Sequence, residues 1–380
     1  MRLPTAVAAH TIFDRMIEIP LELGQRRYDL SIGHGLLSLL PDLLEAFAGR
    51  RIVVVSNHRV WSLHGARVER PLRRIGTLTR VLIPDGEPHK TRATLDAVHD
   101  AFLAAGLGRD GLVVAFGGGV VGDVAGFAAA TYMRGVDWAY VPTTLLAMVD
   151  SSIGGKVGIN HPKAKNLIGA FHQPRAVVTD PSLLETLPPR ELRSGAYEIL
   201  KCGVIADRAL IKALAAAPRG LTGWSRMDVE NAVASACRVK AEVVEKDERD
   251  AGLRQILNLG HTLGHALEAI TRFRRFTHGE AIGWGMIGEA WIARRRGVLT
   301  EAAFDAIAGA VDHLGPRPRV SDLRPERLLE AVSRDKKARK GRVHFVLPVA
   351  LGRVVVRPDV ESAEIRRALK VMAAREALLA

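Results

Sequence analysis

The chain has 380 residues, of which 48% are hydrophobic and 25% charged, and its formal net charge is +13. This balance is that of an ordinary folded protein and excludes a disordered or collagen-like chain, and the length favours two domains. No apolar run reaches the roughly 18 residues that a membrane span needs. Because Cys202 and Cys237 are the only cysteines and no secretory leader is recognisable, we expect a reduced, cytoplasmic protein.

The positive charge raises the alternative of a nucleic-acid-binding protein. The basic residues, however, are scattered in short clusters, and aromatic residues make up only 5% of the chain, too few for base-stacking platforms. We interpret the charge as solvated arginine-rich faces together with sites for a small anionic substrate. We therefore expect neither nucleic acid nor membrane as a partner.

Residues 1–15 carry little pattern and are expected to be an extension. From there to about residue 180, strand-like segments alternate with helical stretches such as 36–47 and 92–105. Alternation of this kind favours a largely parallel α/β sheet. The predicted strands are residues 17–21, 28–32, 52–55, 80–83, 112–116, 138–141 and 176–179.

The pattern changes after residue 180, where apolar residues recur at helical spacing. The predicted helices are residues 191–205, 228–246, 256–270, 280–296, 301–314 and 325–333, with a late strand pair near 343–347 and 354–356. The sequence thus predicts an α/β domain at residues 16–180 and a mostly α-helical domain at 181–380. Because no flexible linker separates them, we expect close packing with the active site in a cleft between the two.

A glycine-rich turn follows the predicted strand at 112–116. Gly117, Gly119 and Gly122 match the G-x-G-x-x-G spacing, and a helix-compatible segment follows. Such a turn lets backbone N–H groups approach a pyrophosphate, so a dinucleotide or phosphate loop is favoured over a merely structural turn. The turn comes after several α/β units, so the usual ribose-binding acid cannot be assigned by counting.

A dense polar block covers residues 132–173. Its lysines, arginine and amides suit a substrate with phosphate or carboxylate groups, whereas the alternative is a solvated loop. A second phosphate-compatible turn lies at residues 85–91.

Three histidines fall within eighteen residues near the middle of the helical half. His261 and His265 are four apart and share one helix face, and His278 starts the next helical pattern. This spacing indicates a metal site or a proton-handling site. Glu198 and Lys201 are three apart on a helix with little polar face, and a carboxylate with imidazoles is a standard Zn²⁺ set, although a surface ion pair is the ordinary reading of that spacing.

Taken together, these strings resemble the 3-dehydroquinate synthases over residues 17–367. The order of the matching strings is what makes the resemblance specific. They are residues 85–91, 117–123, 142–146, 150–156, 160–162, 165–169, 257–268, 278–280, 335–337 and 345–348, with Glu198, Lys201, Lys240, Asp247, Glu248 and Arg254.

The resemblance implies a Rossmann-like α/β domain that binds NAD and a helical domain that holds a divalent metal, zinc or cobalt, on Glu198, His261 and His278. It separates His265 from the metal and places it in the substrate and proton-transfer network. The implied catalytic residues are His265, Lys156, Lys201, Lys240 and Arg254. The implied substrate contacts are these five with Arg134, Asp150, Asn166, Asn258, Lys336 and Lys337. The implied NAD contacts are Asp85, Gly86, Glu87, Lys90, Gly119, Val120, Val121, Gly122, Asp123, Thr143, Thr144, Lys156, Lys165, Leu183, Leu184, Glu185 and Thr186.

The implied activity is a lyase reaction of the shikimate pathway, which leads to chorismate and the aromatic amino acids. The substrate, 3-deoxy-D-arabino-heptulosonate 7-phosphate, is oxidised transiently by NAD, loses phosphate, is reduced again and closes to 3-dehydroquinate by an aldol step. A homodimer is implied as well. The alternatives are a related cyclase acting on sedoheptulose 7-phosphate and a metal-dependent NAD alcohol dehydrogenase.

Three residues depart from the family pattern. Asp250 stands where glutamate is usual, Val157 where threonine is common, and Tyr197 where a small residue precedes the implied metal ligand Glu198. We expect Tyr197 to crowd or reshape the metal site.

Overall fold

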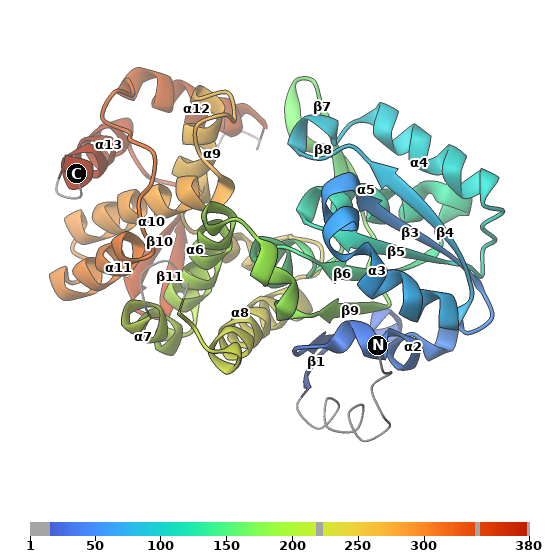
Figure 1. Cartoon of the computed structure of the whole chain (residues 1–380). Helices are drawn as coiled ribbons and strands as arrows, with labels where there is room; N and C mark the ends of the chain where they lie inside the picture. Colours follow the sequence, from blue (N-terminus) through green and yellow to red (C-terminus); the bar gives the residue numbers. More distant parts are fainter. Residues whose placement is uncertain (1–15, 218–222, 339–342, 378–380) are drawn as a thin grey trace. The chain divides into compact units, whose positions relative to one another are not determined.

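The computed structural model describes residues 16–217, 223–338 and 343–377, so the predicted extension at 1–15 lies outside the described part. The chain forms two compact units (Figure 1). Unit 1 comprises Met1–Leu187 and Val229–Glu245, and unit 2 comprises Pro188–Asp228 and Lys246–Ala380. The chain therefore returns to unit 1 with most of helix α8 (Arg226–Lys246), a return that the division at residue 180 did not include.

Unit 1 is built on a seven-stranded sheet with the order β1-β2-β9-β6-β5-β3-β4. Only β1 runs antiparallel to its neighbour β2, and the other pairings are parallel. The strands are β1 (Ile17–Leu21), β2 (Tyr28–Ile32), β3 (Arg51–Asn57), β4 (Thr77–Ile83), β5 (Leu112–Gly117), β6 (Asp137–Pro142) and β9 (Ala176–Thr179). This confirms the predicted strands and the parallel α/β class.

The central strands are apolar throughout because both faces of the sheet are covered. In β5 every residue is buried, and in β3 only Arg51 is exposed. Besides α8, the long helices of unit 1 are α3 (His58–Ile75), α4 (Arg92–Ala104) and α5 (Gly119–Thr131), and α3 was not predicted. Its N-cap is Asn57, whose side chain accepts a hydrogen bond from the Val60 backbone.

One prediction for unit 1 was wrong in detail, and one element was not predicted. The predicted helix at 36–47 is three short pieces, namely 3-10 turns at Leu36–Leu39 and Glu45–Phe47 around α2 (Leu40–Leu43). Pro41 stands at the start of α2, where its missing N–H costs no intrahelical hydrogen bond. Because proline has no N–H to donate, it cannot continue a helix from the residues before it. The polar block also contains a β-hairpin, β7 (Lys156–His161) with β8 (Ala164–Phe171). Its glycines and polar residues hid the period of two.

Unit 2 is mostly helical, as predicted. Its helices are α6 (Pro189–Ile205), α7 (Arg208–Ala216), α9 (His261–Ile270), α10 (His278–Arg295), α11 (Glu301–His313), α12 (Pro325–Ala338) and α13 (Ser362–Ala377), and β10 (Phe345–Ala350) pairs with β11 (Arg353–Arg357). The predicted helix at 256–270 is interrupted, because Gly260 adopts φ +77° between a 3-10 turn and α9. Helix α10 is almost wholly buried and forms the centre of the unit.

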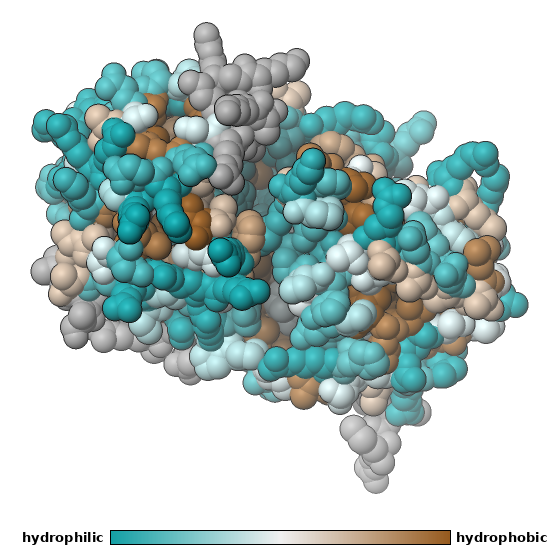
Figure 2. Space-filling model, turned by 90° about the horizontal axis from the view of Figure 1, so that it is seen from above, coloured by the Kyte–Doolittle hydropathy of each residue, from teal (hydrophilic) through white to brown (hydrophobic). Residues whose placement is uncertain are grey.

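One face of the molecule can be compared with the expected surface. Figure 2 shows hydrophilic residues over most of one face, with hydrophobic ones in separate small patches. None of the described helices combines the length and the apolar character that crossing a bilayer requires.

Candidate active site

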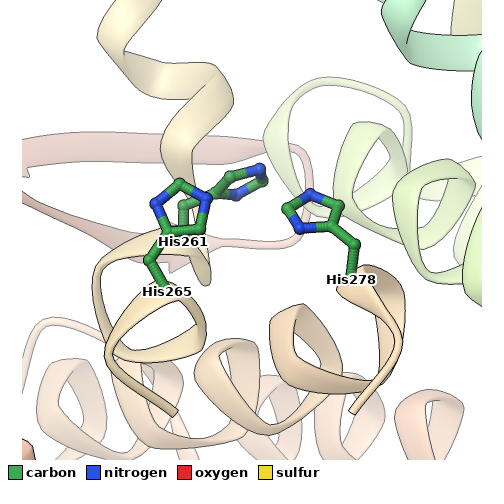
Figure 3. A group of neighbouring side chains, drawn as sticks. All are labelled: His261, His265 and His278. Atoms are coloured by element: carbon green, nitrogen blue, oxygen red, sulfur yellow. The ribbon is translucent and has the colours of Figure 1, made fainter. Parts of the chain in front are cut away.

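The three histidines singled out in the sequence come together in unit 2. Helix α9 presents His261 and His265, and His278 is the first residue of α10 (Figure 3). The ring centroid of His261 lies 5.2 Å from those of both His265 and His278, and the latter two are 5.7 Å apart. One nitrogen of each ring lies within 4.8 Å of the others, a spacing at which three ligands can share one metal ion.

A buried carboxylate completes this group. Glu198 on α6 is only 1% exposed, and its Oε1 lies 3.8 Å from His261 Nε2 and 3.7 Å from His278 Nε2. Its Oε2 forms an ion pair with Lys201, which is equally buried. Oε1 accepts no hydrogen bond from any residue in the described part of the chain. A buried carboxylate oxygen without a donor is costly unless a cation occupies the space in front of it.

The hydrogen bonding of His261 determines which nitrogen faces Glu198. Its Nδ1 lies 3.0 Å from the Leu259 carbonyl oxygen, which can only accept, so Nδ1 carries the proton. Burial, assisted by Lys201 and the other imidazoles, lowers the pKa of His261 well below its ordinary value, so the ring is neutral. Its Nε2 therefore offers a lone pair toward Glu198 Oε1. Two acceptors facing each other fit a divalent cation between them.

Glu268 orients His278 in the same manner. Its Oε2 lies 3.4 Å from His278 Nδ1, and the carboxylate is buried on α9. A carboxylate behind a ligating imidazole fixes the ring and leaves the opposite nitrogen for the metal. Glu268 was not among the predicted site residues, although a single acid in an apolar stretch of α9 was a signal that could have identified it.

Helices α9 and α10 are held together closely enough to fix His261 relative to His278. A Cβ on Gly285 would lie 1.9 Å from the Gly260 carbonyl oxygen, and one on Gly260 would lie 2.7 Å from the Ile282 carbonyl oxygen. The buried Glu289 on α10 accepts a hydrogen bond from the Gly260 backbone at 2.6 Å. Nothing in the sequence pattern indicated this role for Glu289, because acids in a helix are usually solvated.

Tyr197 does not crowd the metal group, contrary to expectation. Its hydroxyl group lies 3.4 Å from the Gly315 carbonyl oxygen and 3.4 Å from Arg317 Nη1, and its ring fills the space beside Gly283. Successive residues of a helix point in different directions, so Tyr197 enters the core while Glu198 faces the histidines.

The glycine-rich turn of unit 1 joins β5 directly to α5, as predicted. The strand order reverses between β3 and β5, and in such sheets ligands bind outside the carboxyl ends of the strands at that point. Gly122 allows α5 to approach the sheet, since a Cβ there would lie 2.3 Å from the Tyr140 ring. The turn leaves backbone N–H groups of the first turn of α5 available to an anion.

Several predicted cofactor residues meet near this turn. Lys90, which is 3% exposed, contacts the Asp123 carboxylate and the Asn166 side-chain oxygen. Lys165 lies 4.0 Å from Glu87. Burial raises the pKa of Asp123 to about 6, although Lys90 opposes the shift. These charges come from three separate segments that the fold brings together.

Two further residues of unit 1 support this group and were not among the predicted site residues. Asn57, at the carboxyl end of β3, donates a hydrogen bond to Asp85 at 2.8 Å. Asn160 donates to Glu87 at 2.7 Å and accepts from the Asn166 backbone at 2.9 Å. An asparagine between a buried strand and a helix was the available signal for Asn57. Predicted Thr143 is buried, and its hydroxyl group has no hydrogen-bond partner among the described residues.

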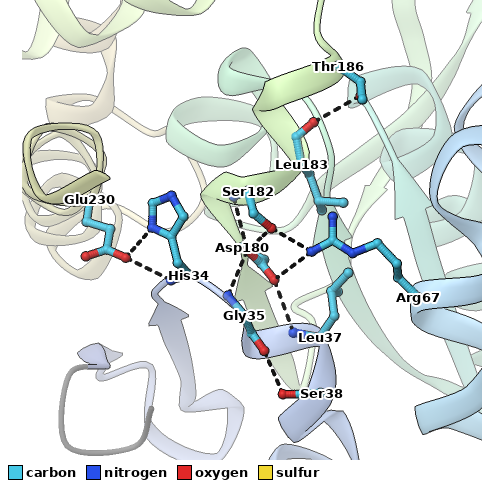
Figure 4. Close-up of polar contacts among 10 residues, drawn as sticks. All are labelled: His34, Gly35, Leu37, Ser38, Arg67, Asp180, Ser182, Leu183, Thr186 and Glu230. Atoms are coloured by element: carbon cyan, nitrogen blue, oxygen red, sulfur yellow. Dashed lines mark hydrogen bonds and ion pairs between the residues drawn. The ribbon is translucent and has the colours of Figure 1, made fainter. Parts of the chain in front are cut away.

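The predicted segment 183–186 is tied into the unit by its own contacts (Figure 4). Leu183 and Leu184 are buried, so only their backbones are available to a cofactor. The Thr186 hydroxyl group lies 2.7 Å from His64 Nε2. Just before it, Asp180 accepts hydrogen bonds from the backbones of Gly35 and Leu37, and His34 contacts Glu230 at 2.5 Å.

The predicted substrate residues divide between the units. In unit 1, Lys240 Nζ donates to the Asp150 carbonyl oxygen at 2.5 Å and contacts its carboxylate. In unit 2, Arg254 is buried and donates to the Glu248 carbonyl oxygen at 2.8 Å. Asn258 is half-buried, whereas Lys156 and Arg134 are exposed, the latter with φ +68°. Lys336 and Lys337 lie on α12, but their side chains are outside the described part.

The sequence matches family models for both parts of one enzyme. Residues 80–194 match the 3-dehydroquinate synthase N-terminal model and residues 195–338 the C-terminal model. The 3-dehydroquinate synthase of Pelotomaculum thermopropionicum is 47% identical over 345 residues, which cover 90% of this chain and 93% of that protein. The 3-dehydroquinate synthase of Gloeobacter violaceus is 45% identical over 360 residues, which cover 94% of this chain and 99% of that protein. The chain therefore belongs to the 3-dehydroquinate synthase family.

Solved structures with the same architecture include other synthases. A 2-epi-5-epi-valiolone synthase from Streptomyces hygroscopicus, with NAD⁺ and Zn²⁺ bound, is 31% identical with a TM-score of 0.83, covering 92% of this chain and 97% of that one. A 2-deoxy-scyllo-inosose synthase complexed with carbaglucose-6-phosphate, NAD⁺ and Co²⁺ has a TM-score of 0.85 at 24% identity, covering 93% and 99%. A glycerol dehydrogenase from Schizosaccharomyces pombe, at 14% identity and a TM-score of 0.64 over 91% and 89%, shares the fold alone.

Proposed function

We propose that this chain is a 3-dehydroquinate synthase, which converts 3-deoxy-D-arabino-heptulosonate 7-phosphate to 3-dehydroquinate and phosphate. Membership of the family supports the activity. The structural observation that carries the proposal is the buried Glu198 Oε1, which accepts no hydrogen bond from a described residue and faces the Nε2 atoms of His261 and His278.

We assign Glu198, His261 and His278 to a divalent metal, zinc or cobalt, and leave His265 outside the ligand set. The orientations of His261 and His278 support this choice, because Leu259 and Glu268 occupy their Nδ1 atoms. The His265 ring centroid lies 5.2 Å and 5.7 Å from those of His261 and His278, and we assign His265 to proton exchange with the substrate. When bound, the metal supplies polarisation of a substrate alcohol, and NAD supplies a hydride acceptor that is restored within each cycle.

The basic residues have a separate task in this proposal. Lys156, Lys201, Lys240 and Arg254 would neutralise the phosphate and carboxylate of the substrate, with Arg134, Asp150, Asn166, Asn258, Lys336 and Lys337 as further contacts. Lys201 and Lys240 are already buried beside carboxylates, so their ammonium groups are held in fixed positions. Fixed charges lower the cost of ordering an anionic substrate.

The proposed NAD contacts lie in unit 1. Gly119, Val120, Val121, Gly122 and Asp123 open α5, and its backbone N–H groups would take the pyrophosphate. The remaining proposed contacts are Asp85, Gly86, Glu87, Lys90, Thr143, Thr144, Lys156, Lys165, Leu183, Leu184, Glu185 and Thr186.

One assay tests the activity. The metal-loaded protein is incubated with NAD⁺ and either the heptulosonate phosphate, sedoheptulose 7-phosphate or glycerol, while phosphate release and net NADH are followed. We expect phosphate from the heptulosonate without accumulating NADH. Phosphate release from sedoheptulose 7-phosphate alone would indicate the related cyclase, and steady NADH formation from an alcohol would indicate a dehydrogenase.

The resemblance also supports a homodimer in the cytoplasm. Light scattering of the purified protein at several concentrations measures the oligomeric state directly. A mass of one chain at micromolar concentration would contradict the homodimer.

A further inference from the structure

Unit 2 contains a surface pocket that the proposed reaction does not use. It has a volume of about 510 Å³ and lies where the end of α9 meets the start of α12. A volume in this range suits a small molecule. The pocket is lined by Ile270, Thr271, Arg274, Arg275, Asp322, Leu323, Arg324 and Arg327.

The lining is strongly basic. It contains four guanidinium groups and one carboxylate, and Arg275 occupies that carboxylate with a two-pronged contact to Asp322 at 2.7 and 3.0 Å. This contact raises the pKa of Arg275 and lowers that of Asp322, so both stay charged. Three positive charges are therefore left uncompensated by the lining itself.

The other three arginines of the lining differ from several arginines elsewhere in unit 2, which have acidic partners. Arg190, Arg294, Arg296 and Arg317 each pair with a carboxylate. By contrast, Arg274, Arg324 and Arg327 are exposed, line one pocket and form no ion pair with a described residue. Like charges held near each other repel, and an anion bound between them would remove that repulsion.

The shape and the charge together define the ligand. Arginine forks match phosphate and carboxylate oxygens in a two-pronged geometry. Thr271 is not a free donor, because its hydroxyl group already donates to the Leu267 carbonyl oxygen at 2.8 Å. We propose that this pocket, which we call the arginine pocket, binds a small soluble molecule with two or more phosphate or carboxylate groups. The proposal is independent of the proposed function.

Calorimetric titration tests the site with two defined probes, inorganic pyrophosphate and citrate. The full-length protein is titrated at about 0.15 M salt, where long-range attraction between exposed charges is largely screened. The double variant R324A/R327A removes two of the guanidinium groups that line the pocket. The matched control R353A/R357A removes two exposed arginines from β11 in the same unit.

We expect at least one probe to bind the wild type and the control alike, and to bind R324A/R327A about tenfold more weakly or worse. Because the proposed active site also takes phosphate, the titration is repeated with K156A, in which binding at the arginine pocket should persist. The proposal is overturned if neither probe binds the wild type, if R324A/R327A binds as well as wild type, or if the control loses as much affinity. A binding signal lost only in K156A would assign the anion to the active site and would also overturn it.

Discussion

The carboxylate of Glu289 accepts a hydrogen bond from the backbone N–H of Gly260 at 2.6 Å, directly before His261 in the chain. Glu289 belongs to α10, the helix that begins with His278, so this one contact connects the segments that carry two proposed metal ligands. Burial raises the pKa of Glu289 well above its ordinary value, although the hydrogen bond from the Gly260 backbone opposes the shift. Because burying an acid is unfavourable in free energy, its presence at this contact indicates that Glu289 has a positioning role.

Replacing Glu289 with Gln should test that role. A glutamine keeps the size but replaces one buried carboxylate oxygen with an NH₂ group, so we expect the free energy of unfolding to fall by about 1–3 kcal/mol. We also expect metal affinity to fall by about tenfold, measured by competition with a chromogenic chelator well below the melting temperature. E301Q, at an exposed ion pair on α11, is the control. Unchanged metal affinity in E289Q would remove Glu289 from the site.

The close packing of α9 on α10 predicts the effect of one added methyl group. In G285A the new Cβ would overlap the Gly260 carbonyl oxygen, so we expect a loss of at least about 2 kcal/mol in unfolding free energy. Gly309 also lies within a helix, α11, but has open space around its Cβ position. G309A should therefore raise stability by about 0.5–1 kcal/mol. Denaturant titrations compare the two, and equal effects would contradict the packing argument.

Metal retention separates the roles of the histidines. H278A should lose tightly bound metal, because it removes one of three proposed ligands, whereas H265A should keep it. Metal content after dialysis against a weak chelator, measured by mass spectrometry, gives the result. Loss of metal from both variants would instead assign all three imidazoles of Figure 3 to the ion.

Glu268 should affect the metal without touching it. In E268Q the contact to His278 Nδ1 loses its negative charge, so we expect metal affinity to fall by about 10–100-fold. The residue is buried, so the isosteric amide limits the change in packing. Chelator competition measures the change, and E268D, which keeps the charge on a shorter side chain, should recover part of the affinity. A wild-type dissociation constant in E268Q would contradict this role.

Asp123 predicts a pH dependence of stability. Its pKa is raised to about 6 from an unfolded value of 3.8, so the folded protein binds this proton more tightly. The unfolding free energy should therefore fall as the pH rises from about 4 to about 6, by up to about 3 kcal/mol from this group. D123N should lack this decline, and D96N, at an exposed site on α4, should keep it. Parallel profiles for D123N and wild type would contradict the assignment.

The sequence predicted most of the regular structure, since its signals are local. Alternating and continuous apolar runs located the seven strands of the main sheet, and helical spacing located α4, α6, α8, α10 and α11. It failed where a single residue breaks a period. Pro41 divides the predicted helix at 36–47, and Gly260 divides the one at 256–270. The hairpin β7–β8 was missed because polar residues and glycines obscure its alternation.

By itself, the sequence determined which residue types are available for chemistry: the glycine-rich turn, the three histidines, and Glu198 with Lys201. Only the tertiary structure decided their partners. Glu198 lies 63 positions before His261, yet packing of both α6 and α9 against α10 brings its buried Oε1 within 3.8 Å of His261 Nε2. Likewise, the sequence does not distinguish Glu268 and Glu289 from ordinary helix acids. The structure shows that each carboxylate is buried against a specific donor. The spacing of residues in the sequence predicts which side chains share a helix face. It does not predict what that face contacts, because this depends on the free-energy cost of burying a charge without a partner.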